Sequence, residues 1–145
     1  MIHLIFDCDG VLVDSEILIA RVMLRALEPL GFVSSEEAYC RRFSGMMNVE
    51  ILDEIARELG KCFSSDFFEQ LTAAADQAFA TTLQPIVGMP ELVRAQTLPV
   101  AVVSNSPMAH VERSLRCAGL SDLPAERIFS SEQVARPKPH PDLYL

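Results

Sequence analysis

The chain has 145 residues, of which 12 are basic and 20 acidic, giving a net charge of −8. Half of the residues are hydrophobic and 22% are charged, a balance that is typical of one globular domain, or of a domain with a small insertion, and excludes a disordered tail or a collagen-like repeat. A protein this acidic is repelled by phosphate backbones and anionic membranes, so neither nucleic acid nor a membrane is expected as a partner.

The N-terminal apolar segment is short and has no basic residues before it, which does not fit a signal peptide, and no apolar run approaches the ~20 residues of a membrane span. The four cysteines, at positions 8, 40, 62 and 117, form no CxxC pair and are expected to be free thiols. We therefore expect a cytoplasmic protein. The sequence leaves the oligomeric state open.

The first predicted element is a strand over residues 2–6, whose nearly continuous apolar run is typical of a strand buried on both faces of a parallel sheet. The apolar pattern then changes to helical periodicity. It predicts helices over 15–30, over 48–59 and from 65 through 79, with glycines ending the first two.

Pro85, Gly88 and Pro90 interrupt this pattern. Beyond them, further elements are expected in this order: a short helix over 89–95, a strand over 99–103, a helix over 108–118 and a weaker strand over 127–130. Strands that alternate with helices indicate an α/β fold with a parallel sheet. Residues 1–14 and 83–145 would then form the core, and 15–82 an inserted, all-helical block.

Polar side chains follow the predicted strands where each strand ends. Asp7 and Asp9 follow the first strand, Ser104 and Asn105 the second, and Lys138 lies in a later loop. Open α/β sheets bind ligands at the carboxyl ends of their strands. Two carboxylates so close together repel each other unless a cation lies nearby, and such oxygen ligands suit magnesium.

A hydroxyl, an amide and a lysine together can satisfy the oxygens of a phosphoryl group. A carboxylate nucleophile beside them would allow phosphoryl transfer through an aspartyl-phosphate. Gly10 permits close backbone approach, so the amides after Asp7 can help to hold an anion.

Three segments carry a resemblance to a known family. Residues 7–16 (DCDGVLVDSE) resemble the first motif of the haloacid dehalogenase-like phosphohydrolases that have an α-helical cap, 102–106 (VVSNS) the second, and 136–142 (RPKPHPD) the third. The resemblance implies a Rossmann-like parallel-sheet core with an inserted helical cap, and Mg²⁺ as cofactor. Residues 42–45 and 103–105 are similar to bacterial sugar-phosphate phosphatases within this family.

The resemblance also implies roles for individual residues. Asp7 would be the nucleophile and a magnesium ligand, and Asp9 would supply a backbone carbonyl to the metal and its side chain as general acid and base. Ser104 would hydrogen-bond the phosphoryl group with Asn105 beside it, and Lys138 would neutralise developing charge and hold Asp7.

The helical block over 15–82 corresponds by resemblance to a lid that excludes water and meets the non-phosphate part of the substrate. Ser44, Gly45 and Met46 lie where the family has a substrate-facing loop. The expected partner is a small phosphorylated metabolite. The three histidines, at positions 3, 110 and 140, share no spacing and are not predicted as ligands.

These observations favour a Mg²⁺-dependent phosphatase that hydrolyses a small phosphate ester, with a sugar phosphate as the expected substrate. A phosphosugar mutase of the β-phosphoglucomutase type uses the same core and stays an alternative. The family's fourth motif, an acidic pair that completes the magnesium shell, does not occur in the 145 residues. On that ground we expect the front part of a longer phosphatase, weakly active by itself, or else an inactive, truncated binding module.

Overall fold

The computed structural model describes residues 2–43 and 46–145. The chain divides into two compact units, one formed by Met1–Ser15 with Leu83–Leu145 and the other by Glu16–Thr82. The first unit carries all the strands, and the second consists of helices. No helix in the described ranges combines the length and the apolar character that a membrane crossing requires.

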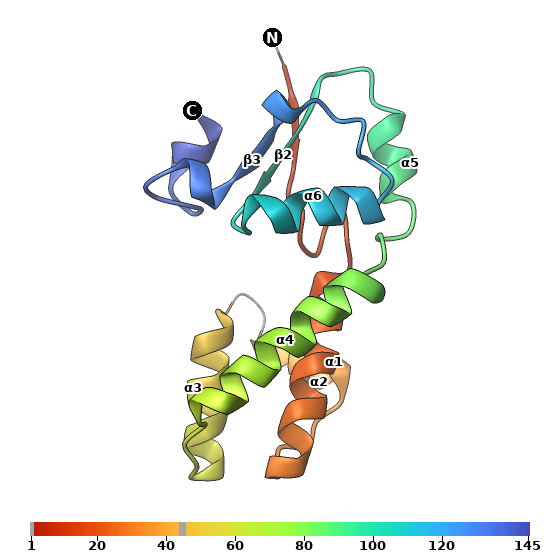
Figure 1. Ribbon diagram of the computed structural model, residues 1–145. Helices are drawn as coiled ribbons and strands as arrows, with labels where there is room; N and C mark the ends of the chain where they lie inside the picture. The colour runs from red at the N-terminus through yellow and green to blue at the C-terminus, as the bar shows by residue number, and fades with distance from the viewer. Residues whose placement is uncertain (1, 44–45) are drawn as a thin grey trace. The chain divides into compact units, whose positions relative to one another are not determined.

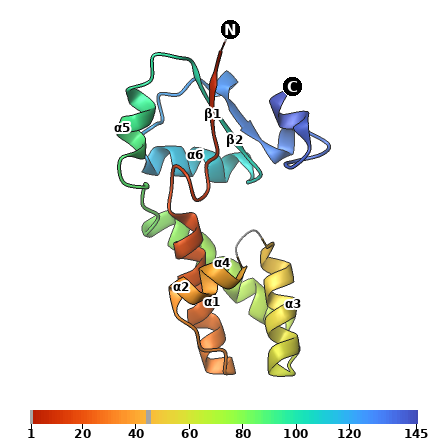
Figure 2. The ribbon, with the colours of Figure 1, turned by 180° about the vertical axis from the view of Figure 1, so that it is seen from behind.

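The first unit is built on a three-stranded parallel sheet, which confirms the predicted α/β class. Its strands are β1 (Leu4–Phe6), β2 (Val100–Ser104) and β3 (Ile128–Ser130), in the order β1-β2-β3. Figure 1 shows α6 (Met108–Cys117) in front of the strands, and the view from behind in Figure 2 shows the strands in front of α6, so this helix covers one face. The short helix α5 (Met89–Arg94) precedes β2.

Single-turn helices complete this unit. They are η2 (Ala125–Arg127) before β3, η3 (Ser131–Gln133) after it, and η4 (Pro141–Tyr144). On α6 the buried apolar side chains Val111 and Leu115 are four residues apart, the spacing that puts two side chains on one helix face. The third predicted motif begins in the loop between η3 and η4 and ends in the first two residues of η4.

Burial differs strongly between the strands. The central strand β2 is buried almost throughout, with Val102 and Val103 inaccessible to solvent. The apolar run of β1 is typical of a strand buried on both faces, but Ile5 in the middle of β1 is 49% exposed, as expected of an apolar edge strand. The reason is topological, because β1 is an edge strand that pairs with β2 alone.

The second unit contains the three predicted helices and one that the periodicity did not indicate. The helices are α1 (Ser15–Leu27, followed by the single turn η1, Glu28–Leu30), α2 (Glu36–Phe43), α3 (Asn48–Leu59) and α4 (Ser65–Thr81). The unpredicted helix α2 has a charge-rich sequence, and its two buried side chains, Tyr39 and Phe43, are too few to make a periodic pattern.

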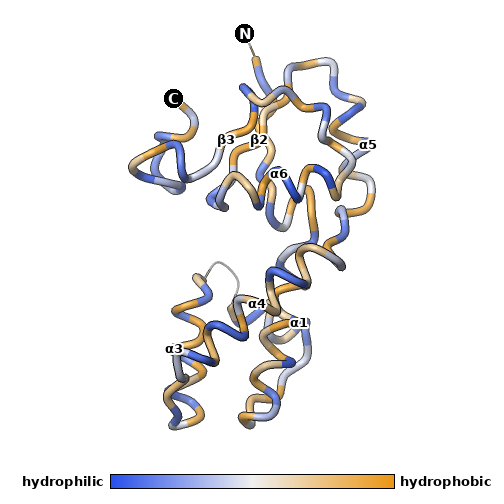
Figure 3. Tube along the Cα trace, viewed as in Figure 1, coloured by the Kyte–Doolittle hydropathy of each residue, from blue (hydrophilic) through white to orange (hydrophobic). Residues whose placement is uncertain are grey.

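One apolar cluster holds these helices together. Its buried members come from α1, α2, α3 and the loop after η1: Ala20, Met23, Leu27, Phe32, Tyr39, Phe43, Ile51, Leu52 and Ile55. The hydropathy colours of Figure 3 alternate along α3, as expected of an amphipathic helix. The apolar periodicity of residues 48–59 would place Val49 on the buried face of this helix, but Val49 is 55% exposed, and Ile51 is buried.

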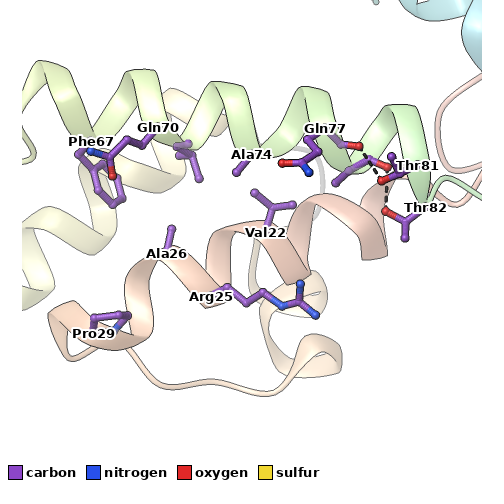
Figure 4. Close-up of a pocket in the computed structure, with 12 residues that line it drawn as sticks. Val22, Arg25, Ala26, Pro29, Phe67, Gln70, Ala74, Gln77, Thr81 and Thr82 are labelled. Carbon is purple, nitrogen blue, oxygen red and sulfur yellow. Dashed lines mark hydrogen bonds between the residues drawn. The ribbon is translucent and has the colours of Figure 1, made fainter.

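A groove of about 680 Å³ lies between α1 and α4 (Figure 4). Its lining combines apolar side chains such as Val22 and Ala74 with the polar Arg25 and Gln77. All of its lining residues belong to the helical unit, and the aspartates predicted as catalytic are not among them.

The apolar cluster of the helical unit leads to a direct prediction about stability. Ile55 is fully buried, so Ile55→Ala should lower the free energy of unfolding by about 2–5 kcal/mol through lost transfer energy and a residual cavity. Val49→Ala, on the same helix but exposed, should change it by less than about 0.5 kcal/mol. Urea unfolding followed by circular dichroism measures both, and equal midpoints for the two variants would contradict the assigned core.

Candidate functional site

The segment after β1 folds into a tight turn that places two aspartates at the carboxyl end of the strand. The carbonyl oxygen of Cys8 accepts hydrogen bonds from the backbone N–H groups of Leu12 (2.9 Å), Val13 (3.3 Å) and Val11 (3.4 Å). Gly10 has φ +70°, a left-handed conformation that side chains disfavour, and its N–H donates to the Val13 carbonyl at 2.9 Å. Cys8, Leu12 and Val13 are buried and anchor the turn.

Asp7 and Lys138 form an ion pair at this end of the sheet. The Lys138 ammonium lies 2.8 Å from Oδ1 of Asp7, and it also donates to the carbonyl oxygen of Val103 in β2 at 3.0 Å. The same Asp7 oxygen accepts from the N–H of Cys8 at 2.8 Å. The Asp7 side chain is 46% exposed, so this carboxylate is accessible to a ligand from solvent.

Asn105 holds the lysine loop in place. Its side-chain oxygen accepts from the backbone N–H of Lys138 at 2.9 Å, and its side-chain NH₂ donates to the carbonyl of the same residue at 3.0 Å. Both ends of the amide are therefore engaged with the backbone of one residue. In this arrangement Asn105 contributes to the site by fixing Lys138.

Asp9 accepts hydrogen bonds on both carboxylate oxygens. Oδ2 accepts from the hydroxyl of Ser106 at 2.7 Å and from that of Ser104 at 3.2 Å. Oδ1 lies 2.9 Å from Nε2 of His110, and since a carboxylate has no proton to give, the ring N–H donates. Ser104 is fully buried, and its hydroxyl oxygen also accepts from the Ser106 N–H at 3.0 Å.

These contacts set the charge state of Asp9. Burial raises the pKa of Asp9, but the hydrogen bonds from His110 and Ser106, with the charge of His110 and a hydrogen bond from Ser15, outweigh it and lower the pKa to about 2. Asp9 is thus a carboxylate at neutral pH. Burial, followed by the charge of Asp9, raises the pKa of the Cys8 thiol to about 12, which keeps this cysteine protonated and a poor nucleophile.

Two residues of this cluster were missed by the sequence reasoning. Ser106 lies two positions after Ser104, inside the second motif, so its position could have been considered. His110 lies in the first turn of α6 and carries no local signal, because its partner Asp9 is distant in the chain. The start of α6 also depends on a residue distant in the chain, because the Met108 N–H donates to the Glu132 carboxylate at 2.9 Å. The hydroxyl of the nearby Ser106 donates to Asp9.

The residues of the turn fit a magnesium ion. Magnesium commonly takes one or two carboxylates and completes its shell with water and substrate phosphate. Asp7 offers an accessible carboxylate. In the part of the chain that the structure describes, the backbone hydrogen bonds of the turn leave the Asp9 carbonyl oxygen without a donor. No group of three or more His, Cys, Asp or Glu side chains is placed to hold a metal among the same residues.

The predicted cap loop is only partly described. Ser44 and Gly45 lie outside the described residues. Met46 is half-buried and packs against the apolar cluster of the helical unit. A role for this loop in substrate binding stays a prediction.

Comparison with known proteins places these features in a wider group. The chain is 32% identical to the 6-phosphogluconate phosphatase of Escherichia coli (strain K12) over 139 residues, covering 95% of this chain and 63% of that protein. The crystal structure of a haloacid dehalogenase-like protein of unknown function from Agrobacterium tumefaciens superposes with a TM-score of 0.88 at 33% identity, covering 98% of this chain and 65% of that one. A haloacid dehalogenase family hydrolase from Deinococcus radiodurans gives a TM-score of 0.81 at 34% identity, over 98% and 63%.

The chain spans less than two thirds of the length of these three proteins. The family model of the haloacid dehalogenase-like hydrolases matches residues 4–145, which include the turn with both aspartates, the serines after β2 and the Lys138 loop. With this match over nearly the whole chain, the protein belongs to the haloacid dehalogenase-like hydrolase family.

Proposed function

We propose that the protein is a Mg²⁺-dependent phosphatase that hydrolyses a small phosphate ester, of the sugar-phosphate type, through an aspartyl-phosphate on Asp7. The observation that carries the proposal is the arrangement at the carboxyl end of the sheet: an accessible Asp7 carboxylate paired with Lys138, and beside it Asp9 held by hydroxyl and imidazole donors. A nucleophile, a cation and a second carboxylate in a different environment are groups that suit phosphoryl transfer through a covalent intermediate.

In the first step an Asp7 carboxylate oxygen attacks phosphorus, and the bond from phosphorus to the ester oxygen breaks. The leaving alcohol oxygen takes a proton from Asp9, which must carry that proton and release its present hydrogen bonds to act as an acid. Lys138 neutralises part of the negative charge and limits the rotation of Asp7.

In the second step water attacks phosphorus, and the bond to Asp7 breaks. Asp9 takes the proton from the attacking water, so inorganic phosphate is released and Asp9 again carries the proton that the next first step needs. The hydrogen bonds to both Asp9 oxygens stabilise its carboxylate form, which suits this base step.

Asp7 and the Asp9 carbonyl oxygen would hold Mg²⁺, together with water and substrate phosphate. When bound, the ion neutralises the phosphoryl oxygens and orients the phosphate toward the nucleophile. The D. radiodurans hydrolase was solved with bound phosphate and sodium, so a protein of similar fold binds both an anion and a cation.

The substrate class rests on the relatives. 6-Phosphogluconate phosphatase from E. coli is named for a phosphorylated sugar acid, and a second relative, 31% identical, is hexitol phosphatase B. We extend this class to the present protein, with the helical unit Glu16–Thr82 as the part that confers specificity. The partner is then a small phosphorylated metabolite.

The first prediction for the activity concerns the nucleophile. The purified protein with Mg²⁺ should release inorganic phosphate from members of a sugar-phosphate panel, and chelation by EDTA should abolish the release. Asp7→Asn should lower kcat by a factor on the order of 10³ or more, because an amide cannot form the acyl phosphate. Asp122→Asn, an exposed aspartate of the same unit, is the control and should retain wild-type activity.

The panel also separates the alternatives. Conversion of one sugar phosphate into its isomer, without phosphate release, would indicate a mutase. The absence of both reactions and of a phosphorylated protein would support an inactive module and contradict the proposal.

The second prediction concerns Asp9. Asp9→Asn should lower kcat for a sugar phosphate by about 10²–10⁴, because both proton transfers are lost. With an aryl phosphate, whose leaving group needs no proton, the variant should still form the phosphoenzyme but hydrolyse it slowly. Mass spectrometry of the quenched reaction should then show an added phosphoryl group on Asp7. A variant that turns over as fast as the wild type would remove Asp9 from the mechanism.

A further inference from the structure

In the proposed mechanism the hydrogen bond from His110 helps to keep Asp9 a carboxylate, and the same contact bears on how that carboxylate is oriented. His110 is one of three histidines in the chain. It lies in the first turn of α6, and its side chain is mostly shielded from solvent. Its Nε2 lies 2.9 Å from Oδ1 of Asp9. When a partly buried carboxylate accepts a hydrogen bond from a ring N–H, that bond can fix the orientation of the carboxylate.

The position of His110 is fixed by the packing of its helix. Val111, the next residue, is fully buried, and Leu115 one turn later is nearly so. The first backbone N–H of α6, that of Met108, donates to the Glu132 carboxylate in the segment after β3. The start of α6 is therefore held by Glu132 and by the buried side chains of the helix, so His110 contacts Asp9 from a fixed position.

The donors around Asp9 divide between its two oxygens. Ser104 and Ser106 both donate to Oδ2, and His110 donates to Oδ1, while Ser15 adds a further hydrogen bond to this carboxylate. Donors on a single oxygen restrict the rotation of the carboxylate about the Cβ–Cγ bond through that atom alone. A donor on the second oxygen, from the different element α6, adds an independent restraint on the same rotation.

We infer that His110 is a positioning residue that fixes the Asp9 carboxylate for the water-attack step. This inference rests on the proposed phosphatase function. It assigns the hydrogen bond between His110 and Asp9 to the hydrolysis of the phosphoenzyme. The contact that carries this inference is the hydrogen bond from His110 to the Asp9 carboxylate. It should therefore affect the hydrolysis of the phosphoenzyme, for which Asp9 accepts a proton, more than its formation from an ester that needs no acid.

The test uses 4-nitrophenyl phosphate and the intact protein with Mg²⁺. In His110→Leu, the rate constant for the first burst of nitrophenol should stay within about threefold of wild type, while the steady-state rate falls about 10- to 100-fold. Because the phosphoenzyme then accumulates, kcat and KM fall together and kcat/KM stays nearly unchanged. General damage to the site would instead lower the burst rate and kcat/KM as well.

Conservative replacement supplies the second readout. The side-chain amide of glutamine can place an N–H near the position of Nε2, so His110→Gln should recover most of the steady-state rate lost in His110→Leu. His3→Gln makes the same chemical change at an exposed position and should behave as wild type. Thermal unfolding of all three variants identifies any that fails to fold, and the glutamine variant keeps the comparison open if the leucine variant is unstable.

The possible outcomes distinguish a failure of the inference about His110 from a failure of the proposed function. If the wild type turns over and His110→Leu leaves the steady-state rate unchanged, or lowers burst and steady state equally, the inference about His110 is wrong and the proposed function stands. A glutamine variant no better than leucine would also overturn it. If the wild type shows neither a burst nor turnover with this ester and the sugar-phosphate panel, the proposed function itself fails, and the inference fails with it.

Discussion

The ion pair between Lys138 and Asp7 is the contact on which the candidate site depends. It joins a loop near the end of the chain to the residue that follows the first strand. Because the lysine also donates to the Val103 carbonyl, it connects the β1 and β2 ends of the sheet at one point. Asn105 hydrogen-bonds both the backbone N–H and the carbonyl of Lys138, so the lysine stays in place even though its loop has no regular structure.

The two aspartates of the turn show how environment divides similar groups between different tasks. Asp7 is half-exposed, with a cation and one backbone N–H on the same oxygen, which leaves it accessible to a phosphorus atom or a metal. Asp9 is more enclosed, and both its oxygens accept hydrogen bonds from side chains. The first environment suits a nucleophile, and the second suits a base whose direction matters. A single turn, closed at Gly10 and anchored by Cys8, supplies both.

Several elements could be predicted from the sequence because their signals are local. The apolar runs before Asp7 and Ser104 predict strands, and the observed strands end within a residue of the predicted bounds. Gly60 ends α3 in a left-handed conformation, as its position after the periodic segment indicates. Where burial was predicted from periodicity alone, it failed at Ile5 and Val49, since an edge strand and the first turn of a helix have fewer neighbours than the pattern assumes.

The α/β class, the order of the elements and the residue types after each strand follow from the amino-acid sequence, because they depend on spacing and on chemistry within short segments. Three contacts emerge only in the folded chain: His110 donates to Asp9, Ser106 donates to Asp9, and the Glu132 carboxylate accepts from the first N–H of α6. Such contacts join residues far apart in the chain, and hydrogen-bond geometry within about 3 Å depends on how the helix packs on the sheet, which no local pattern specifies.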